Sequence, residues 1–272
     1  MIETEQSYVA AEAKRRDYDR WLATLFATPA HRDGIFALLA FNGEIASIRE
    51  TVSEVLLGDI RLQWWRDAIM EIGTGFARSH PVVEALDRTV STYHLDKSLL
   101  SQMIDSRSLD LNPCPFKTVD ELLNYADGTG GILNELIHRV LGRDTSAELT
   151  AAREVGRAFA LTGIIRAIPF HMSQDLVLIP KTMLAVQGLS SETLFLAENR
   201  AALFLVVEEM AQLAERVHRD ALQQRGAKKP QFQLSRLTGL YLSRLRAAGF
   251  DPADKKMTVG VLRKIIALSL GR

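Results

Sequence analysis

The stretch Tyr125-Ala126-Asp127-Gly128-Thr129-Gly130-Gly131 places three glycines within four positions. Glycines at this density let one helix approach another closely, because no Cβ atom separates the two backbones. Two other blocks accompany the stretch, Arg61-Leu62-Gln63-Trp64-Trp65-Arg66-Asp67 before it and Leu161-Thr162-Gly163-Ile164-Ile165-Arg166 after it. The order and the spacing of these three blocks are the strongest indication of the fold.

Apolar residues recur at helical spacing along almost the whole chain. One stripe consists of Leu203, Val206, Met210, Leu213 and Val217, and a second of Ile35, Leu38, Leu39, Asn42 and Ile45, with one polar residue set into it. Steps of three and four residues are typical of an amphipathic helix. No stretch alternates like a half-buried strand, and the short apolar run before Pro180 stops there. We therefore predict an all-α fold of about ten to twelve helices, in a single domain over residues 1–272.

Local signals mark some of the helix boundaries. Asp33 and Thr118 are predicted N-caps, and Glu121 follows Thr118 at the spacing of a capping box. Cys114 lies between two prolines, which place it in a loop, and we interpret it as a structural residue. Because it is the only cysteine, no internal disulfide can form, and this favours a reducing compartment such as the cytoplasm.

The charge balance gives no indication of a charged partner. Lys plus Arg and Asp plus Glu both number 33, so no global field favours nucleic acid or an acidic membrane surface. The acidic start at residues 1–5 lacks the apolar centre of a targeting signal. No apolar run approaches the roughly 18 to 20 residues that span a bilayer. We predict a cytoplasmic protein with no nucleic-acid partner and no transmembrane segment, and peripheral association with the inner membrane stays open.

The three blocks occur in the order and at roughly the spacing of the squalene/phytoene synthase family, which the sequence resembles from about Tyr18 to Pro180. The resemblance implies a helical bundle of the isoprenoid synthase type around a central cavity. It also implies that the glycine block is a softened helix beside that cavity, although close packing explains the glycines equally well. In active members of the family, two aspartate-rich helical motifs hold Mg²⁺ against a diphosphate.

The aspartates of both motifs are absent from this sequence. Alignment of the flanking residues places Ala46, Ser47 and Glu50 on the first motif and Ala167 and His171 on the second. Mg²⁺ requires hard oxygen ligands, and one glutamate with one histidine cannot replace several carboxylates. We therefore predict no metal, no cofactor and no catalytic residues. Mg²⁺ would be required only if the protein were a prenyltransferase with a rearranged site.

The polar and aromatic residues of the three blocks and of the flanking helices form the candidate pocket: Asn42, Arg49, Arg61, Trp64, Arg66, Tyr125, Thr129, Thr162 and Arg166. Each of them has an alternative structural role in core packing or ion pairing. We expect the former metal site to contain an internal polar network in which Glu50 pairs with one of the arginines. The apolar residues expected to narrow the cavity are Phe36, Leu39, Leu133, Phe159 and Ile165.

A narrower resemblance concerns Phe41–Ala46, Ile60–Asp67 and Asp110–Phe116. These segments are similar to the branch of the family that also lacks the aspartates and includes the mitochondrial complex I assembly factor six and its bacterial relatives. The resemblance implies a non-catalytic assembly or binding factor whose protein partner is a subunit of respiratory complex I. Two alternatives remain open. One is a prenyltransferase with Glu50, Arg49, Arg61, Arg66 and Arg166 around a diphosphate, and the other is a carrier of isoprenoids or lipids.

Overall fold

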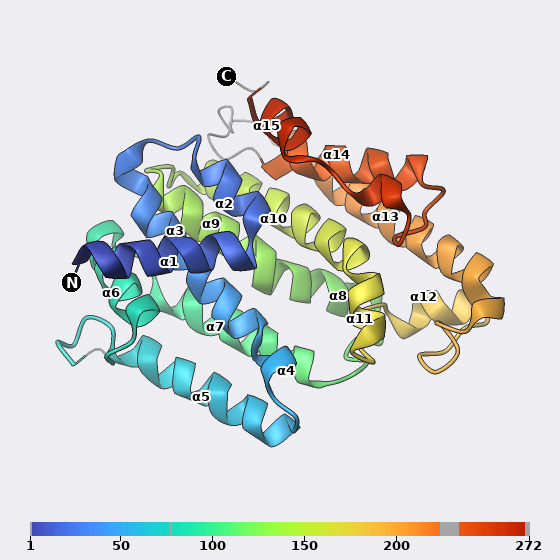
Figure 1. Cartoon of the computed structure of the whole chain (residues 1–272), viewed down its shortest axis with the longest axis horizontal. Helices are drawn as coiled ribbons and strands as arrows, with labels where there is room; N and C mark the ends of the chain where they lie inside the picture. Colours follow the sequence, from blue (N-terminus) through green and yellow to red (C-terminus); the bar gives the residue numbers. More distant parts are fainter. Residues whose placement is uncertain (1, 77, 224–233, 270–272) are drawn as a thin grey trace.

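The computed structural model describes residues 2–76, 78–223 and 234–269, with side chains from residue 8 onward. No strand is assigned in this part of the chain, so the predicted all-α class is confirmed. Its α-helices are α1 (Ile2–Arg16), α2 (Tyr18–Thr24), α3 (Pro29–Ala46), α4 (Ile48–Thr51), α5 (Val55–Glu71), α6 (Pro81–Tyr93), α7 (Lys97–Arg107), α8 (Val119–Ala126), α9 (Ile132–Val140), α10 (Ser146–Arg166), α11 (Ile168–Ser173), α12 (Lys181–Val186), α13 (Arg200–Gln223), α14 (Leu234–Ala247) and α15 (Val261–Ser269). Figure 1 shows their arrangement.

The helix boundaries follow local chemistry at most of the predicted positions. The capping box at the start of α8 is present, because Thr118 Oγ1 accepts a hydrogen bond from the backbone N–H of Glu121 and the Glu121 carboxylate accepts from Thr118 N–H. Cys114 lies in the loop before α8, as expected. The predicted N-cap at Asp33 is wrong. Helix α3 begins four residues earlier at Pro29, whose fixed φ and missing N–H suit the first helical position.

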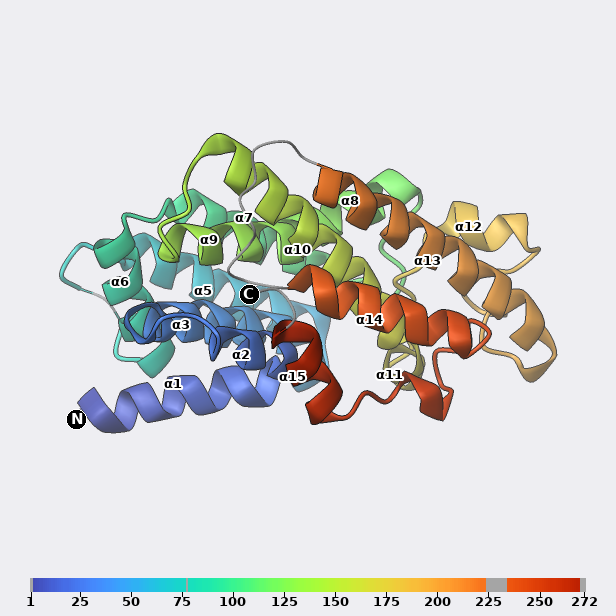
Figure 2. The same cartoon turned by 90° about the horizontal axis from the view of Figure 1, so that it is seen from above.

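Two clusters of buried apolar side chains hold the helices together. The first lies among α3, α5, α6, α7 and α9, and the second among α8, α10, α13 and α14. The predicted stripe on α3 packs into the first cluster, and Val206, Met210 and Leu213 of α13 pack into the second. Helix α10 runs between the two groups (Figures 1 and 2). No described helix is long and apolar enough to cross a membrane.

The glycine block forms a π-helical turn, η2 (Asp127–Gly131), between α8 and α9. This turn packs directly on α10, where a Cβ atom on Gly130 would lie 2.7 Å from the carbonyl oxygen of Gly156. Gly128 and Gly131 are also crowded by neighbouring side chains. The glycines are therefore required for close contact between the two backbones, and the π-helical turn is the irregular helix that the resemblance implied.

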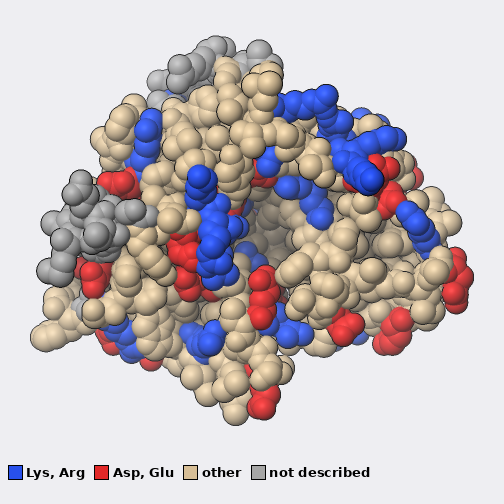
Figure 3. All heavy atoms as spheres, viewed as in Figure 1, with Lys and Arg blue, Asp and Glu red and all other residues tan. Residues whose placement is uncertain are grey.

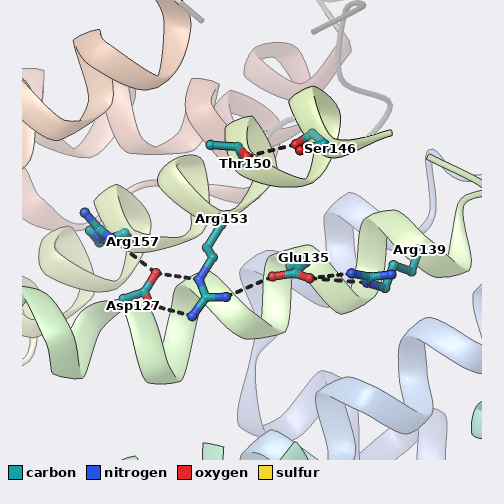
Figure 4. Close-up of polar contacts among 7 residues, drawn as sticks. All are labelled: Asp127, Glu135, Arg139, Ser146, Thr150, Arg153 and Arg157. Carbon is teal, nitrogen blue, oxygen red and sulfur yellow. Dashed lines mark hydrogen bonds and ion pairs between the residues drawn. The ribbon is translucent and has the colours of Figure 1, made fainter. Parts of the chain in front are cut away.

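Ion pairs reinforce this contact between η2 and α10 (Figure 4). The Arg153 guanidinium donates to both carboxylate oxygens of Asp127, at 2.8 and 2.7 Å, and its third nitrogen reaches Glu135 of α9 at 3.1 Å. Arg157 contacts Asp127 at 3.4 Å, and Arg139 pairs with Glu135 at 2.8 Å. A bidentate arginine fixes orientation as well as distance, so it holds the π-helical turn in register with α10.

Candidate functional site

A cavity of about 340 Å³ lies beside the C-terminal ends of α3 and α10, and its lining includes the predicted metal-motif positions Ala46, Ala167 and His171. Its lining comes from eight α-helices, the π-helical turn η2 and three residues between helices: Arg16, Asp17, Arg20, Asn42, Ala46, Arg107, Tyr125, Thr129, Gly130, Leu133, Phe159, Ala160, Gly163, Ile164, Ala167, His171 and Leu178. In the space-filling view of Figure 3 the surface is hollowed near the centre, and Lys and Arg side chains border the hollow together with some Asp and Glu side chains. The cavity therefore combines a basic part with an apolar wall.

Three arginines from three helices supply the basic part. Arg20 pairs with Asp17 at 2.6 Å and stacks over the Phe159 ring, with 4.6 Å between the guanidinium carbon and the ring centroid. Arg107 lies 3.2 Å from Asp110 and donates to the hydroxyl of Tyr125 at 2.7 Å. Arg16 enters the cavity beside Gly43, because a Cβ atom on this glycine would lie 2.6 Å from Arg16 Cβ.

Several polar atoms of the lining are buried and make no hydrogen bond within the described part of the chain. They are the Nε atoms of Arg16, Arg20 and Arg107, Oδ1 of Asn42 and Nδ1 of His171. A buried polar group without a partner costs about 1 to 3 kcal/mol, so a cluster of five indicates a site for a polar ligand or water. Guanidinium donors suit phosphate and carboxylate oxygens, which makes an anion the matching ligand.

Burial shifts the pKa values around Arg107. Burial, together with the nearby Arg107 charge, lowers the pKa of His171 to about 4, so the ring is neutral near pH 7. Burial likewise raises the pKa of Tyr125, and the Tyr125 hydroxyl donates to Asp110 at 2.6 Å. Asp110 and Tyr125 thus hold the Arg107 guanidinium in place, and its Nε atom is buried without a hydrogen bond to a described residue.

The His171 pKa predicts how stability depends on pH. Because the folded-state pKa of about 4 is below the unfolded value of about 6.5, the unfolded chain binds a proton that the folded chain does not. Stability should therefore fall as the pH decreases from about 6.5 to about 4, by up to about 3 kcal/mol from this ring alone. Chemical denaturation of wild type and His171→Gln across this range measures the difference. Parallel pH profiles for the two proteins would contradict the prediction.

The predicted site residues separate into two groups that line different cavities. Asn42, Tyr125 and Thr129 of the candidate pocket line the cavity described above, as do Ala46, Ala167 and His171 of the metal-motif positions. Ser47, Arg61 and Trp64 line a neighbouring cavity of about 260 Å³. Arg16 borders both cavities.

The remaining predicted residues have structural partners or lie outside both linings. Arg66 pairs with Asp105 at 2.9 Å, Thr162 Oγ1 donates to the Ala158 carbonyl at 2.9 Å, and Arg166 reaches Asp19 at 3.2 Å. Arg49 lines neither cavity, although its Nε atom is buried without a hydrogen bond in the described structure. Neither cavity lining brings these residues together, and the rearranged prenyltransferase site stays a prediction.

The expected network around Glu50 is also wrong. Glu50 is exposed at the end of α4, and it has no hydrogen bond or ion pair with any described residue. Arg61 instead donates to Thr51 Oγ1 at 2.6 Å. The reason is the break between α3 and α4, since Ser47 ends α3 and turns the following helix toward solvent. Among the expected apolar residues, Leu133 and Phe159 line the cavity, whereas Phe36, Leu39 and Ile165 pack elsewhere in the core.

Sequence reasoning missed the three arginines that form the basic part of the cavity. Arg16, Arg20 and Arg107 are all absent from the candidate pocket predicted from the sequence. One signal was present, because Arg16 and Arg20 are four residues apart on either side of a helix break at Asp17. Gly43 was a second signal, since a glycine inside an apolar helix indicates close approach by another chain segment.

The donor set of this cavity does not fit the magnesium ions of the family. The only carboxylate in the lining is Asp17, which pairs with Arg20. Over the described ranges, no group of three or more His, Cys, Asp or Glu side chains is arranged to hold a metal ion. Ala46 and Ala167 offer methyl groups where hard oxygen ligands would be required.

The fold and the arginine-lined cavity define an all-α protein of the isoprenoid synthase type. The chain belongs to the squalene/phytoene synthase family, whose family model matches residues 13–263. The similarity in three dimensions extends to a dehydrosqualene synthase at 16% identity, with a TM-score of 0.84 over 98% of this chain and 95% of that one. A squalene synthase from Alicyclobacillus acidocaldarius gives a TM-score of 0.77 at 14% identity, covering 93% of this chain and 97% of that structure.

Similar sequences within the family carry a different description. The chain is 32% identical over 188 residues to the complex I assembly factor 6 of Homo sapiens, and 33% identical over 180 residues to that of Bos taurus. These alignments cover 69% and 66% of this chain, and 56% and 54% of the respective relatives. The chain thus spans about half the length of these relatives. A 15-cis-phytoene synthase of Enterobacter agglomerans is 30% identical over 42% of this chain and 39% of its own length.

Proposed function

We propose that this protein is a non-catalytic member of the family that acts as an assembly or binding factor, with a subunit of respiratory complex I as its protein partner. The observation that carries the proposal is the lining of the cavity. It contains Ala46, Ala167 and His171, which the sequence comparison aligns with the metal-binding acids of the family, and three arginines. The similarity to the mammalian complex I assembly factor 6 proteins supports the choice of partner.

The residues that line the cavity suit the binding of an anion but not the catalysis of isoprenyl condensation. Isoprenyl condensation requires a diphosphate leaving group whose developing charge is neutralised by metal ions held on several carboxylates. Arginines can bind an anion, but removing even one group that stabilises transition-state charge costs about 2.7 to 4 kcal/mol. Replacing a cluster of carboxylates with two alanines and a neutral histidine removes several such groups. In the proposed role, the protein keeps the cavity but does not catalyse isoprenyl condensation.

An assay with isoprenyl diphosphates tests the proposal directly. The purified protein, incubated with farnesyl or geranylgeranyl diphosphate and Mg²⁺, should form no condensation product above a control without enzyme. An active phytoene synthase in the same buffer serves as the positive control. Product formation, or diphosphate release well above the control, would overturn the proposal in favour of a prenyltransferase. Deletion in the source organism should reduce the amount of assembled complex I, and an unchanged amount would contradict the assembly role.

A second candidate function is a carrier of an anionic amphiphile such as an isoprenoid or lipid. The observation that favours it is the pairing of the arginines with an apolar wall of Leu133, Phe159, Ile164 and Leu178 in one cavity. At about 340 Å³ the cavity is near the lower limit of typical ligand sites, so a short chain fits better than a long one. Displacement of a fluorescent farnesyl probe measures this. Saturable sub-micromolar binding of a long prenyl chain would favour the carrier.

A further inference from the structure

The last described helix, α15, presents an apolar stripe to solvent. Val261, Leu262, Ile265 and Ile266 are all exposed on it, and Leu262 retains 71% of its accessible surface. These positions are spaced by one and four residues, so they lie along one side of the helix. On its other side, Leu268 is buried and Lys264 reaches Asp19 of α2 at 2.7 Å. The exposed stripe is therefore held in place by contacts on the opposite side of α15.

The segment that carries this stripe is rich in basic residues, although the chain as a whole has no net charge, and two of them, Lys264 and Arg246, pair with Asp19 and Glu215. Residues 234–269, which include α14 and α15, contain seven Lys and Arg residues and two Asp residues. Both aspartates are engaged, because Asp251 pairs with Arg200 at 2.7 Å and Asp254 accepts a hydrogen bond from Lys256 N–H at 2.7 Å. Lys255 and Arg263 are exposed close to the stripe in sequence. The chain is neutral overall, but residues 234–269 contain more basic than acidic residues.

The stripe lies on the face of the molecule where the cavity opens. Helices α1, α11 and α15 are on the same side in Figures 1 and 2, and the hollow of Figure 3 is seen from that side. Phe170 and Met172 of α11 are also exposed there. This face thus combines exposed apolar side chains with basic ones around the cavity.

We propose that α15 docks this protein onto the surface of a bilayer that contains anionic lipids. A short amphipathic helix lies in the interface when its apolar side chains enter the acyl boundary and its basic residues attract anionic headgroups. The nine residues of α15 are far fewer than the roughly 20 that cross a bilayer, so the contact is with one surface. This interaction does not depend on whether the cavity binds a ligand or on the proposed role in assembly.

Vesicle flotation with the full-length protein tests the proposal. The protein should bind vesicles in which about a third of the lipid is phosphatidylglycerol and bind phosphatidylcholine vesicles at least about tenfold more weakly. The double variant Leu262→Glu/Ile266→Glu should lower binding to the anionic vesicles by at least about tenfold, because two apolar anchors are lost. The variant Lys255→Glu/Arg263→Glu should lower it to a similar extent on anionic vesicles only. High salt should have the same effect as this second variant.

The matched control uses exposed apolar residues on a different helix. Leu56 and Ile60 of α5 are exposed to a similar degree, and α5 lies at the opposite edge of the molecule in Figure 1. Leu56→Glu/Ile60→Glu should bind vesicles like wild type, and all variants should retain the wild-type melting temperature. Equal binding to neutral and anionic vesicles, or loss of binding in the α5 variant alone, would overturn the proposal. A change of oligomeric state in the α15 variant without vesicle binding by wild type would identify a protein interface instead.

Discussion

Asp19→Ala is expected to destabilise the protein by about 3 to 5 kcal/mol, the cost of removing one partner from a buried ion pair. The Asp19 carboxylate is buried and accepts from the Tyr241 hydroxyl at 2.6 Å, from Lys264 at 2.7 Å and from Arg166 at 3.2 Å. These groups come from α2, α14, α15 and α10, so one carboxylate connects four helices. The variant leaves two cations near the core without their counter-charge. Urea denaturation measures the loss.

The pH dependence gives an independent measurement of the same interaction. Burial raises the pKa of Asp19, but the hydrogen bonds from Lys264 and Tyr241 and the charge of Arg166 together outweigh burial and lower the pKa below its ordinary value. The stabilisation is thus present above about pH 4 and is lost as the pH falls through the lower folded-state pKa. The difference between wild type and Asp19→Ala should shrink in that acidic range. A difference independent of pH would show that the variant acts through packing.

Asp105→Ala is the matched control for Asp19→Ala. Asp105 pairs with Arg66 at 2.9 Å on the surface, where both side chains are partly exposed. An exposed pair of this kind contributes about 0 to 1 kcal/mol. Similar losses of stability in the two variants would contradict the role of Asp19 as a buried carboxylate that connects four helices.

Gly156→Ala should destabilise the protein by about 3 kcal/mol or more, the upper end of what overpacking costs. The added Cβ would clash with the backbone carbonyl oxygen of Gly130 and lie 2.7 Å from Asn134 Cβ. A backbone carbonyl in a packed turn cannot move aside as the end of a flexible side chain can. The π-helical turn would have to separate from α10. Thermal and urea denaturation should both show the loss.

Gly163→Ala on the same helix is the matched control. No atom outside its own helix lies within 4 Å of a Cβ placed on Gly163. Alanine has the higher helix propensity, so this variant should gain about 0.5 to 1 kcal/mol. A destabilised Gly163→Ala, or a Gly156→Ala with wild-type stability, would contradict the packing of η2 on α10.

The sequence alone determined the fold class and the longer helices. The stripes on α3 and α13 repeat at helical spacing and pack into the two cores, because a helix is stable in a protein when its apolar side is buried. The capping box at Thr118 was equally readable, since its partners are three residues apart. Short helices such as α4, α11 and α12 contain four to six residues and show no usable periodicity. Their omission accounts for the smaller predicted number of helices.

The candidate site was only partly predictable from the sequence. The flanking blocks correctly directed attention to Ala46, Ala167 and His171, which line one cavity in the structure. The partners of the arginines could not be predicted in this way. Arg166 was one of several arginines considered as a partner for Glu50, and it instead reaches Asp19, which is 147 positions away in the sequence. Arg16 and Arg20 line the cavity although they lie outside all three blocks.

The helices could be predicted and the partners of the arginines could not, because the two depend on interactions over different distances along the sequence. Helix formation, capping and amphipathic spacing depend on residues three or four positions apart, so the sequence by itself determined them. An arginine side chain is long and flexible, and it pairs with whichever acid the packed helices bring within reach. Only the tertiary structure decided that Asp19 engages Arg166 and Lys264, and that Arg16, Arg20 and Arg107 come together at the cavity.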